Sequence, residues 1–246
     1  MKYDIIIPHY GSSKEVVELA QVCLRSIRRW SKDYRLVWID NGGSEPLLKE
    51  INRHREVLII RLEENVGFVK AVNLGLQVAL APYVVVMNND TEAVSGWLEK
   101  LSMPLQGAVI GSGPRTITEE SWQGKSVPVS EETVILSRSA MLAFFCVMFQ
   151  REVIQKVGLL DEDYGLGFGD DDDYCDRIHK KGLRLAWVTG LTIPHHHRTT
   201  FRTMFKESEI KRMQTHGMAL FKNKVARREV EKGKEQVTKR LRILKG

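Results

Sequence analysis

The sequence predicts an α/β fold in which a mostly parallel sheet is flanked by helices. From Asp4 to Asp90, short apolar segments of strand length alternate with segments of helical periodicity, which is the pattern of parallel strands joined by crossover helices. The apolar run Tyr83–Met87 lacks period-2 alternation and indicates a strand buried on both faces. It stops at Asn88-Asn89-Asp90, and open α/β sheets bind ligands at the carboxyl ends of their strands. The alternative is a plain turn that caps the next helix.

The first half of the chain divides into four strands and three helices. We expect the strands at Asp4–Pro8, Arg35–Ile39, Val57–Leu62 and from Tyr83. The capping box Ser12–Glu15 opens the first helix. Pro46 begins a short second helix that ends near Arg53. A third helix follows Gly67, and its expected buried stripe is Val69, Val72, Leu76 and Leu80.

The second half is less regular. The pattern predicts a helix at Ser95–Leu101, strands at Ala108–Gly111, Met141–Phe149 and Leu185–Val188, a helical turn at Glu152–Val157, and a helix from Asp170 to Lys181 with Gly182 as its cap. The stretch from Ser112 to Arg138 shows little periodicity. A loop of that length inside a compact domain is usually functional or mobile.

Composition predicts a globular domain with a basic extension. The chain has 246 residues, of which 43% are hydrophobic and 28% charged, so it is long enough to bury a full core. The net charge is +6, and residues 222–246 alone carry ten Lys or Arg against three Glu. We therefore expect a domain over residues 1–202 and a basic helical extension over residues 203–246.

Several features exclude other classes of protein. No charged leader precedes the first apolar segment, and the longest apolar run is too short to cross a bilayer. Cys23, Cys146 and Cys175 are odd in number and far apart, which favours reduced thiols in the cytoplasm over disulfides or a zinc site.

Four consecutive aspartates, Asp170 to Asp173, precede a helical segment. Like charges that crowd in this way raise at least one carboxyl pKa, which suits a general base, although a helix N-terminus offsets part of the repulsion. Asp173 lies four residues before Arg177, the spacing of a helical salt bridge. The alternative is a simple acidic N-cap.

The order of five motifs resembles that of the GT-A glycosyltransferases of family 2, which are inverting enzymes that use nucleotide sugars. The resemblance covers residues 3–200. The segments that carry it are Ile5–Tyr10, Asp40–Ser44, Glu64–Gly75, Asn88–Asp90, and Gly158–Glu162 together with Asp170–Arg177. The third is the most specific match. Asn88–Asp90 lies where the family carries its Asp-x-Asp motif, with Asn88 in place of the first Asp. Among the members of the family, the rhamnosyltransferase-like ones have the most similar motifs, because they also tolerate an Asn or Pro inside this motif.

The resemblance implies roles for individual residues. Asp171 aligns with the catalytic aspartate, flanked by Asp170 and with Asp172 as the alternative base. Asp40 would accept a hydrogen bond from a pyrimidine imide. The remaining residues of the donor site would be Pro8, His9, Tyr10, Asn65, Gly67, Lys70, Asn88 and Asn89. Lys70 lies near the start of its helix, where its charge and the N-terminal amides of the helix would favour a diphosphate, and its spacing to Asn65 and Asn73 supports this role. The alternatives are that Asp40 is a turn residue and Lys70 a solvated lysine.

The resemblance also implies a divalent cation, Mn²⁺ or Mg²⁺. Its ligands would be Asp90 and a histidine after the last core strand, for which His195 and then His197 are the candidates; a polar loop is the alternative. Trp122 and Phe168 are candidate platforms for a sugar ring, although aromatic residues are more often part of the core.

The function that follows is transfer of a sugar from a nucleotide-diphosphate sugar, UDP- or dTDP-linked, to a glycan or lipid-linked acceptor. The rival is a non-catalytic module that binds a nucleotide sugar or a nucleic acid. The basic extension predicts contact with an anionic membrane surface at the inner face of the membrane, with a second subunit or a nucleic acid as the other partners.

Overall fold

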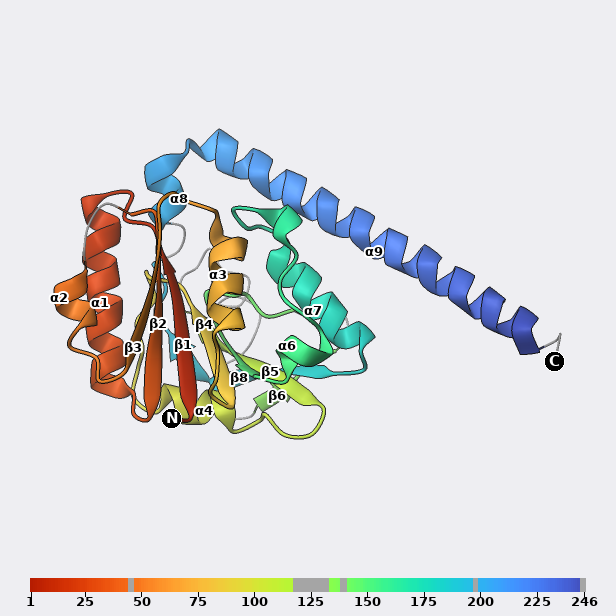
Figure 1. The fold of residues 1–246 in the computed structure, drawn as a ribbon, viewed down its shortest axis with the longest axis horizontal. Coiled ribbons are helices and arrows are strands. Elements are labelled where there is room, and N and C mark those ends of the chain that lie inside the picture. Colours follow the sequence, from red (N-terminus) through yellow and green to blue (C-terminus); the bar gives the residue numbers. More distant parts are fainter. Residues whose placement is uncertain (44–46, 117–132, 138–140, 197–198, 244–246) are drawn as a thin grey trace.

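The computed structural model describes residues 1–43, 47–116, 133–137, 141–196 and 199–243. It confirms an α/β fold with an eight-stranded sheet in the order β3-β2-β1-β4-β7-β5-β8-β6 and a long C-terminal helix. The sheet is flanked by helices on both faces (Figure 1). The strand predicted to be central, β4, occupies the fourth position of this order.

The N-terminal strands form a parallel half-sheet. These are β1 (Tyr3–His9), β2 (Tyr34–Asn41), β3 (Val57–Leu62) and β4 (Tyr83–Met87). All three pairings among them are parallel. The carboxyl ends of these strands therefore meet at one edge of the sheet, where Asn88–Asp90 follow β4.

The C-terminal strands make the sheet mixed. These are β5 (Val109–Thr116), β6 (Thr133–Ile135), β7 (Cys146–Gln150) and β8 (Arg184–Ile193). Strand β7 runs antiparallel to both β4 and β5, while β5 and β8 pair in parallel. The sheet therefore changes from parallel to mixed beside β4.

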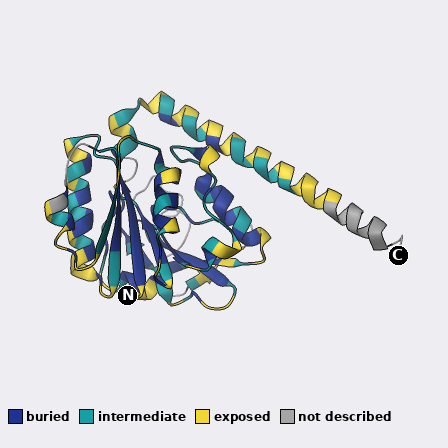
Figure 2. Ribbon diagram, in the orientation of Figure 1, coloured by how far each residue is buried: buried dark blue, intermediate teal, exposed yellow. Residues whose placement is uncertain are grey.

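Two layers of helix cover the sheet. On one face lie α1 (Lys14–Trp30), α2 (Leu48–Ile51) and α4 (Trp97–Ser102); on the other lie α3 (Phe68–Gln77), α6 (Val153–Lys156), the short 3-10 helix η1 (Glu162–Tyr164) and α7 (Asp170–Lys180). Alternate residues of each central strand enter the two apolar cores, so Ile5 and Ile7 pack towards α1 and Ile6 packs towards α3. Figure 2 shows the resulting buried interior.

Two expectations about helices were wrong in detail. Leu80 is 69% exposed because α3 ends at Gln77, and its amide instead donates to the buried carboxylate of Asp4. The cap of α1 is Ser13, whose hydroxyl accepts from the Val16 amide, so the helix starts one residue later than the proposed capping box requires.

Three strand assignments were also wrong in extent. Of the apolar run Met141–Phe149, only Cys146–Phe149 belongs to a strand, which continues to Gln150; residues 144–145 form a turn. The supposed loop from Ser112 contains the rest of β5 and all of β6 among its described residues. Strand β8 continues to Ile193, beyond the expected end at Val188.

The C-terminal segment consists of α8 (Thr199–Met204) and α9 (Glu207–Ile243). The first part of α9 lies along α7, and its second part extends beyond the body of the molecule (Figure 1). In the described chain, none of the helices has both the length and the apolar character needed to cross a bilayer. The three cysteines are buried and free, as expected.

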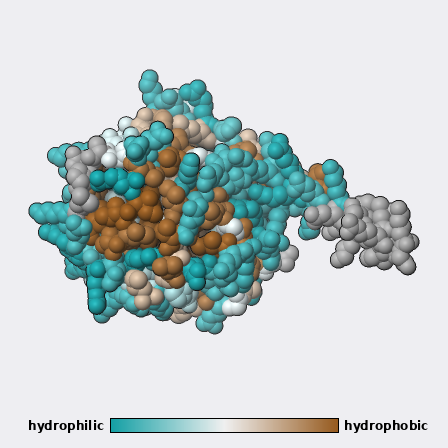
Figure 3. Space-filling view, in the orientation of Figure 1, coloured by the Kyte–Doolittle hydropathy of each residue, from teal (hydrophilic) through white to brown (hydrophobic). Residues whose placement is uncertain are grey.

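Part of the sheet is only partly covered. Figure 3 shows apolar side chains gathered over β2 and β3 beside α3. Leu58, Ile60 and Leu62 of the edge strand β3 are half-buried there and pack against the core on the α3 side.

Candidate functional site

A row of polar side chains lies at the carboxyl ends of β2, β1 and β4. His9 is the register partner of Asp40 on the neighbouring strand, and its Nδ1 lies 2.8 Å from the Asn89 amide nitrogen. The His9 ring packs against Trp38. Burial lowers the pKa of His9 to about 4, so the ring is neutral at physiological pH. When the Asn89 amide donates to Nδ1, the proton of His9 resides on Nε2.

Asp40 presents one free acceptor. Its Oδ2 accepts from Arg61 Nε at 2.8 Å, whereas its Oδ1 is buried and makes no hydrogen bond to the described residues. An orphaned buried carboxylate oxygen is costly unless a partner supplies a proton. Asp40 lines neither of the two pockets described below, so its role in binding a nucleobase stays a prediction.

Asn41 and Asn65 hold the loop that precedes α3. The Asn41 side chain donates to Asn65 Oδ1 at 3.0 Å and accepts from the Val66 amide at 3.0 Å. Asn65 Oδ1 also accepts from the Gly67 amide. These bonds show a structural role for Asn65. At Gly67 the φ of 89° and the approach of Gly165 O, 2.6 Å from where a Cβ would lie, explain the glycine.

After β4, Asp90 meets a histidine from the far end of β8. Asp90 Oδ1 lies 3.2 Å from His195 Nε2, and the Asn88 amide nitrogen lies 3.4 Å from the same atom. The His195 ring stacks on Phe145 at 4.7 Å. Burial alone would raise the pKa of Asp90, but the neighbouring His195 holds this pKa below its usual value.

Two pockets open beside these residues. The strand-end pocket is lined by Pro8, His9, Tyr10, Asn65 and Asn88–Asp90. The acidic pocket is lined by Asp170–Asp172, Asn88 and His195. Both are also lined by Phe68, Leu166 and Phe201, so the pockets adjoin. The arrangement can hold two parts of a ligand, one at the strand ends and one beside the carboxylates.

The acidic pocket brings together the three predicted carboxylates at the first turn of α7. Asp170 and Asp172 are buried, whereas Asp171 is half-buried and is the most accessible of the three. Asp171 Oδ1 accepts from the Asp172 amide at 3.0 Å. Burial raises the pKa of Asp171, and burial with the charges of Asp171 and Asp173 raises that of Asp172 to about 7. The cluster therefore exchanges protons nearer to neutrality than isolated aspartates do.

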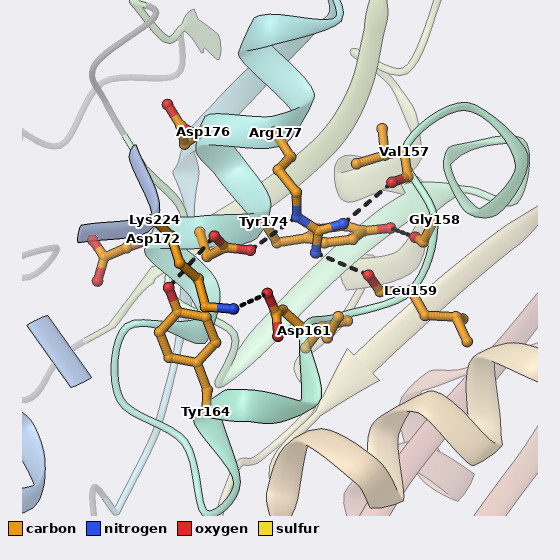
Figure 4. A network of polar contacts seen from close by, with 12 residues as sticks. Val157, Gly158, Leu159, Asp161, Tyr164, Asp172, Tyr174, Asp176, Arg177 and Lys224 are labelled. Atoms are coloured by element: carbon orange, nitrogen blue, oxygen red, sulfur yellow. Dashed lines mark hydrogen bonds and ion pairs between the residues drawn. The ribbon is translucent and has the colours of Figure 1, made fainter. Parts of the chain in front are cut away.

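The salt bridge predicted within α7 is confirmed. Arg177 Nε lies 2.8 Å from Asp173 Oδ2, and the same guanidinium donates to the carbonyls of Val157 and Leu159 (Figure 4). Arg177 thus fixes α7 to the chain segment before η1.

Some predicted residues lie away from the pockets. Lys70 is exposed on the first turn of α3 and lines neither pocket, so its role in binding a diphosphate stays a prediction. Phe168 does line the acidic pocket, with its ring 4.8 Å from that of Phe201. His197 and Trp122 lie outside the described residues.

Sequence reasoning missed the contribution of the C-terminal helices. Thr199, Phe201 and Met204 of α8 line the strand-end pocket, while Gln214 and Met218 of α9 line the acidic pocket. The periodicity indicated helix in this region, but it carried no signal for the direction in which the chain returns to the site.

A divalent cation fits the donors beside β4 only in part. Asp90 Oδ1 and the Asn88 side-chain nitrogen both lie near His195 Nε2, so one carboxylate, one imidazole and one amide are neighbours. Carboxylate, imidazole and amide oxygen are ligands that Mn²⁺ accepts when phosphate oxygens complete the set. Over the described part of the chain, no three carboxylate, imidazole or thiol side chains form a ready-made metal site.

Comparison with known proteins assigns the chain to a family. Residues 4–158 match the sequence profile of "Glycosyl transferase family 2". The chain is similar to a "Pre-mycofactocin glycosyltransferase" of Mycobacterium tuberculosis, with 23% identity over 194 residues. That match covers 73% of this chain and 41% of the relative, so the chain spans less than half of the relative's length.

Two solved structures share the fold. One is Staphylococcus aureus TarS 1-349 in complex with UDP-GlcNAc, with a TM-score of 0.64 and 16% identity over 90% of this chain and 65% of that one. The other is the mannosyltransferase PcManGT of Pyrobaculum calidifontis in complex with GDP-Man and Mn²⁺, with a TM-score of 0.62 and 16% identity over 79% and 56% of the two chains. The profile match extends over more than half of this chain, from β1 to the segment before α7, and the chain therefore belongs to glycosyl transferase family 2.

Proposed function

We propose that this protein transfers a sugar from a nucleotide-diphosphate sugar to an acceptor hydroxyl, with inversion at the anomeric carbon. The observation that carries the proposal is the junction of the two pockets. A pocket at the strand ends, with orphaned polar groups nearby, adjoins a pocket with three carboxylates whose proton affinity is raised. A donor that lies across both would place its anomeric carbon near the acids.

At the acidic pocket, Asp171 is the general base. It is the most accessible of the three carboxylates, and the others flank it on the same helical turn. The acceptor O–H gives its proton to Asp171 while the oxygen attacks the anomeric carbon, and the bond from that carbon to the diphosphate breaks with its electrons on the leaving oxygen. A base with a raised pKa suits this task at neutral pH.

At the strand ends, Asp40 and His9 suit a pyrimidine base. The free Oδ1 of Asp40 accepts from an imide N–H, and the Nε2 proton of His9 donates to a neighbouring carbonyl. Uracil and thymine carry an imide N–H between two carbonyls, which favours a UDP- or dTDP-sugar. The UDP-GlcNAc bound to TarS is in line with this, whereas PcManGT holds GDP-Man.

The diphosphate would lie beside Asp90 and His195. These two residues, with Asn88, would hold Mn²⁺ or Mg²⁺, and the bound cation supplies neutralisation of the leaving diphosphate. The structural relative PcManGT was solved with Mn²⁺.

The rival function is that of a module that binds a nucleotide sugar, or a nucleic acid, without turnover. A donor screen separates the two. The protein is incubated with UDP-glucose, UDP-GlcNAc, a dTDP-sugar and GDP-mannose, with and without MnCl₂ or MgCl₂, and released nucleoside diphosphate is measured. We expect release from a uridine or thymidine donor. Tight binding of a donor with no release under any condition would favour the rival.

The C-terminal part of α9 carries a separate prediction about membrane binding. Val230 of α9 is 58% exposed, and the sequence from 234 to 246 carries five Lys or Arg, as expected of a helix that contacts an anionic surface. We expect the protein to co-sediment with phosphatidylserine vesicles at low salt, and removal of residues 232–246 to abolish this. If the truncation changes only the oligomeric mass, the tail is instead a contact between subunits.

A further inference from the structure

Helix α9 forms a wall of the acidic pocket, and its backbone touches the loop that leads into α7. A Cβ built at Gly217 would lie 2.0 Å from the Phe168 carbonyl oxygen, and one at Gly169 would lie 2.8 Å from the Gly217 carbonyl. Two glycines therefore allow the backbones of α9 and the Phe168 loop to touch. The same loop ends at Asp170, the first residue of α7.

One face of α9 continues this contact with charged side chains. Gly217, Phe221, Lys224 and Arg228 follow one another at helical spacing, and Phe221 is partly buried against the core on the α3 and α7 side of the sheet. Lys224 Nζ lies 2.6 Å from Asp161 Oδ2 (Figure 4). It also lies 2.6 Å from Asp163 Oδ2. Lys224 thus holds the turn before η1.

Arg228 holds α7 itself. Its guanidinium forms ion pairs with Asp173 and, at 2.9 Å, with Asp176. Only 23% of the Arg228 side chain is exposed, and Asp173 is fully buried. A buried carboxylate requires such partners, and removal of one partner leaves part of its charge uncompensated.

Asp173 connects Arg228 to the helical turn that carries the other three aspartates. Arg177 of α7 and Arg228 of α9 face it with positive charge, and Tyr164 of η1 donates a hydrogen bond to it. Asp172 precedes it in the chain, and the charge of Asp173 contributes to the raised pKa of Asp172.

We propose that Arg228 is a positioning residue of the transferase site, with Lys224 as its supporting contact, so that the C-terminal helix sets the geometry and the charge of the acidic turn. This inference rests on the proposed function. It makes α9 part of the reaction centre as well as a tail.

The first test uses stability and needs no donor. Unfolding midpoints of the full chain are compared at pH 5 and pH 8 for the wild type, Arg228→Gln and the matched control Arg227→Gln. Arg227 is the adjacent, exposed arginine. Because Asp172 and its neighbours carry more negative charge at pH 8, loss of Arg228 should lower the midpoint by several degrees more at pH 8 than at pH 5. The control should show no such difference. An equal loss at both pH values would mean that Arg228 acts only through its ion pairs with Asp173 and Asp176 and has no influence on Asp172, and would overturn the inference.

The second test uses turnover of whichever donor in the screen the wild type hydrolyses. Without Arg228, the pKa values of the acids rise further, so the acidic limb of the pH–rate profile should move to higher pH. We expect kcat to fall roughly 10- to 100-fold with an unchanged donor KM, and Arg228→Lys to recover much of the loss.

A wild-type profile in Arg228→Gln would contradict the inference while leaving the transferase function intact. An inactive wild type would count against the proposed function, and the stability test would still decide the inference.

If Arg228→Gln does not fold, Lys224→Gln takes its place in both tests. It removes the same charge from the same face but leaves the buried Asp173 paired with Arg228 and Arg177. A smaller loss in the same direction supports the inference, and wild-type behaviour overturns it.

Discussion

Asp171→Asn should lower kcat by about 10²- to 10⁴-fold, the range for loss of a general base. The asparagine keeps the shape of the side chain but cannot take the acceptor proton. Because we propose that the donor's nucleotide binds in the strand-end pocket, away from Asp171, the dissociation constant of the nucleotide should stay within about twofold of wild type. Single-turnover transfer and nucleotide titration measure the two quantities.

Asp172→Asn and the exposed Glu56→Gln serve as comparisons for Asp171. Glu56→Gln should behave as wild type. A larger loss in Asp172→Asn than in Asp171→Asn would move the role of base to Asp172.

The wild-type rate should also rise with pH through about 7, where Asp172 titrates, because a raised pKa delays deprotonation of the cluster. In Asp171→Asn, the rise of the rate with pH should differ from that of the wild type.

Asp90→Ala should reduce transfer by roughly 10²- to 10³-fold, the loss expected when one group that stabilises developing charge is removed. The variant loses the carboxylate that faces His195 at 3.2 Å. Excess chelator should have the same effect on the wild type, and added MnCl₂ or MgCl₂ should reverse it. Glu99→Ala removes an exposed carboxylate of α4 and should retain activity. Full wild-type activity in chelator would refute the role of the cation.

The parallel half of the fold could be predicted closely because its signals are local. Val57–Leu62 and the strand from Tyr83 are apolar runs bounded by polar residues, and the structure places both as expected. Strand β8 and the antiparallel β7 were harder. Their extent depends on partners far away in the chain, since β8 passes a bulge against β5 and continues to Ile193.

The site could be predicted from motifs only where one short segment supplies the residues. Asp170–Asp172 share one helical turn, and the pairing of Asp90 with His195 followed from the expected position of a histidine after the last strand. The contacts of Lys224 and Arg228 join residues more than fifty positions apart. No local pattern distinguishes these two cations from the exposed ones around them, so only the fold reveals them.

The measurement that tests the central claim most directly is the anomeric configuration of the first product. Proton NMR of the sugar released or transferred from an α-linked UDP-sugar, recorded before mutarotation, reports it. A single displacement assisted by Asp171 predicts the β anomer. Initial formation of the α anomer would contradict the account, because it requires retention and a different role for the carboxylates of the acidic pocket.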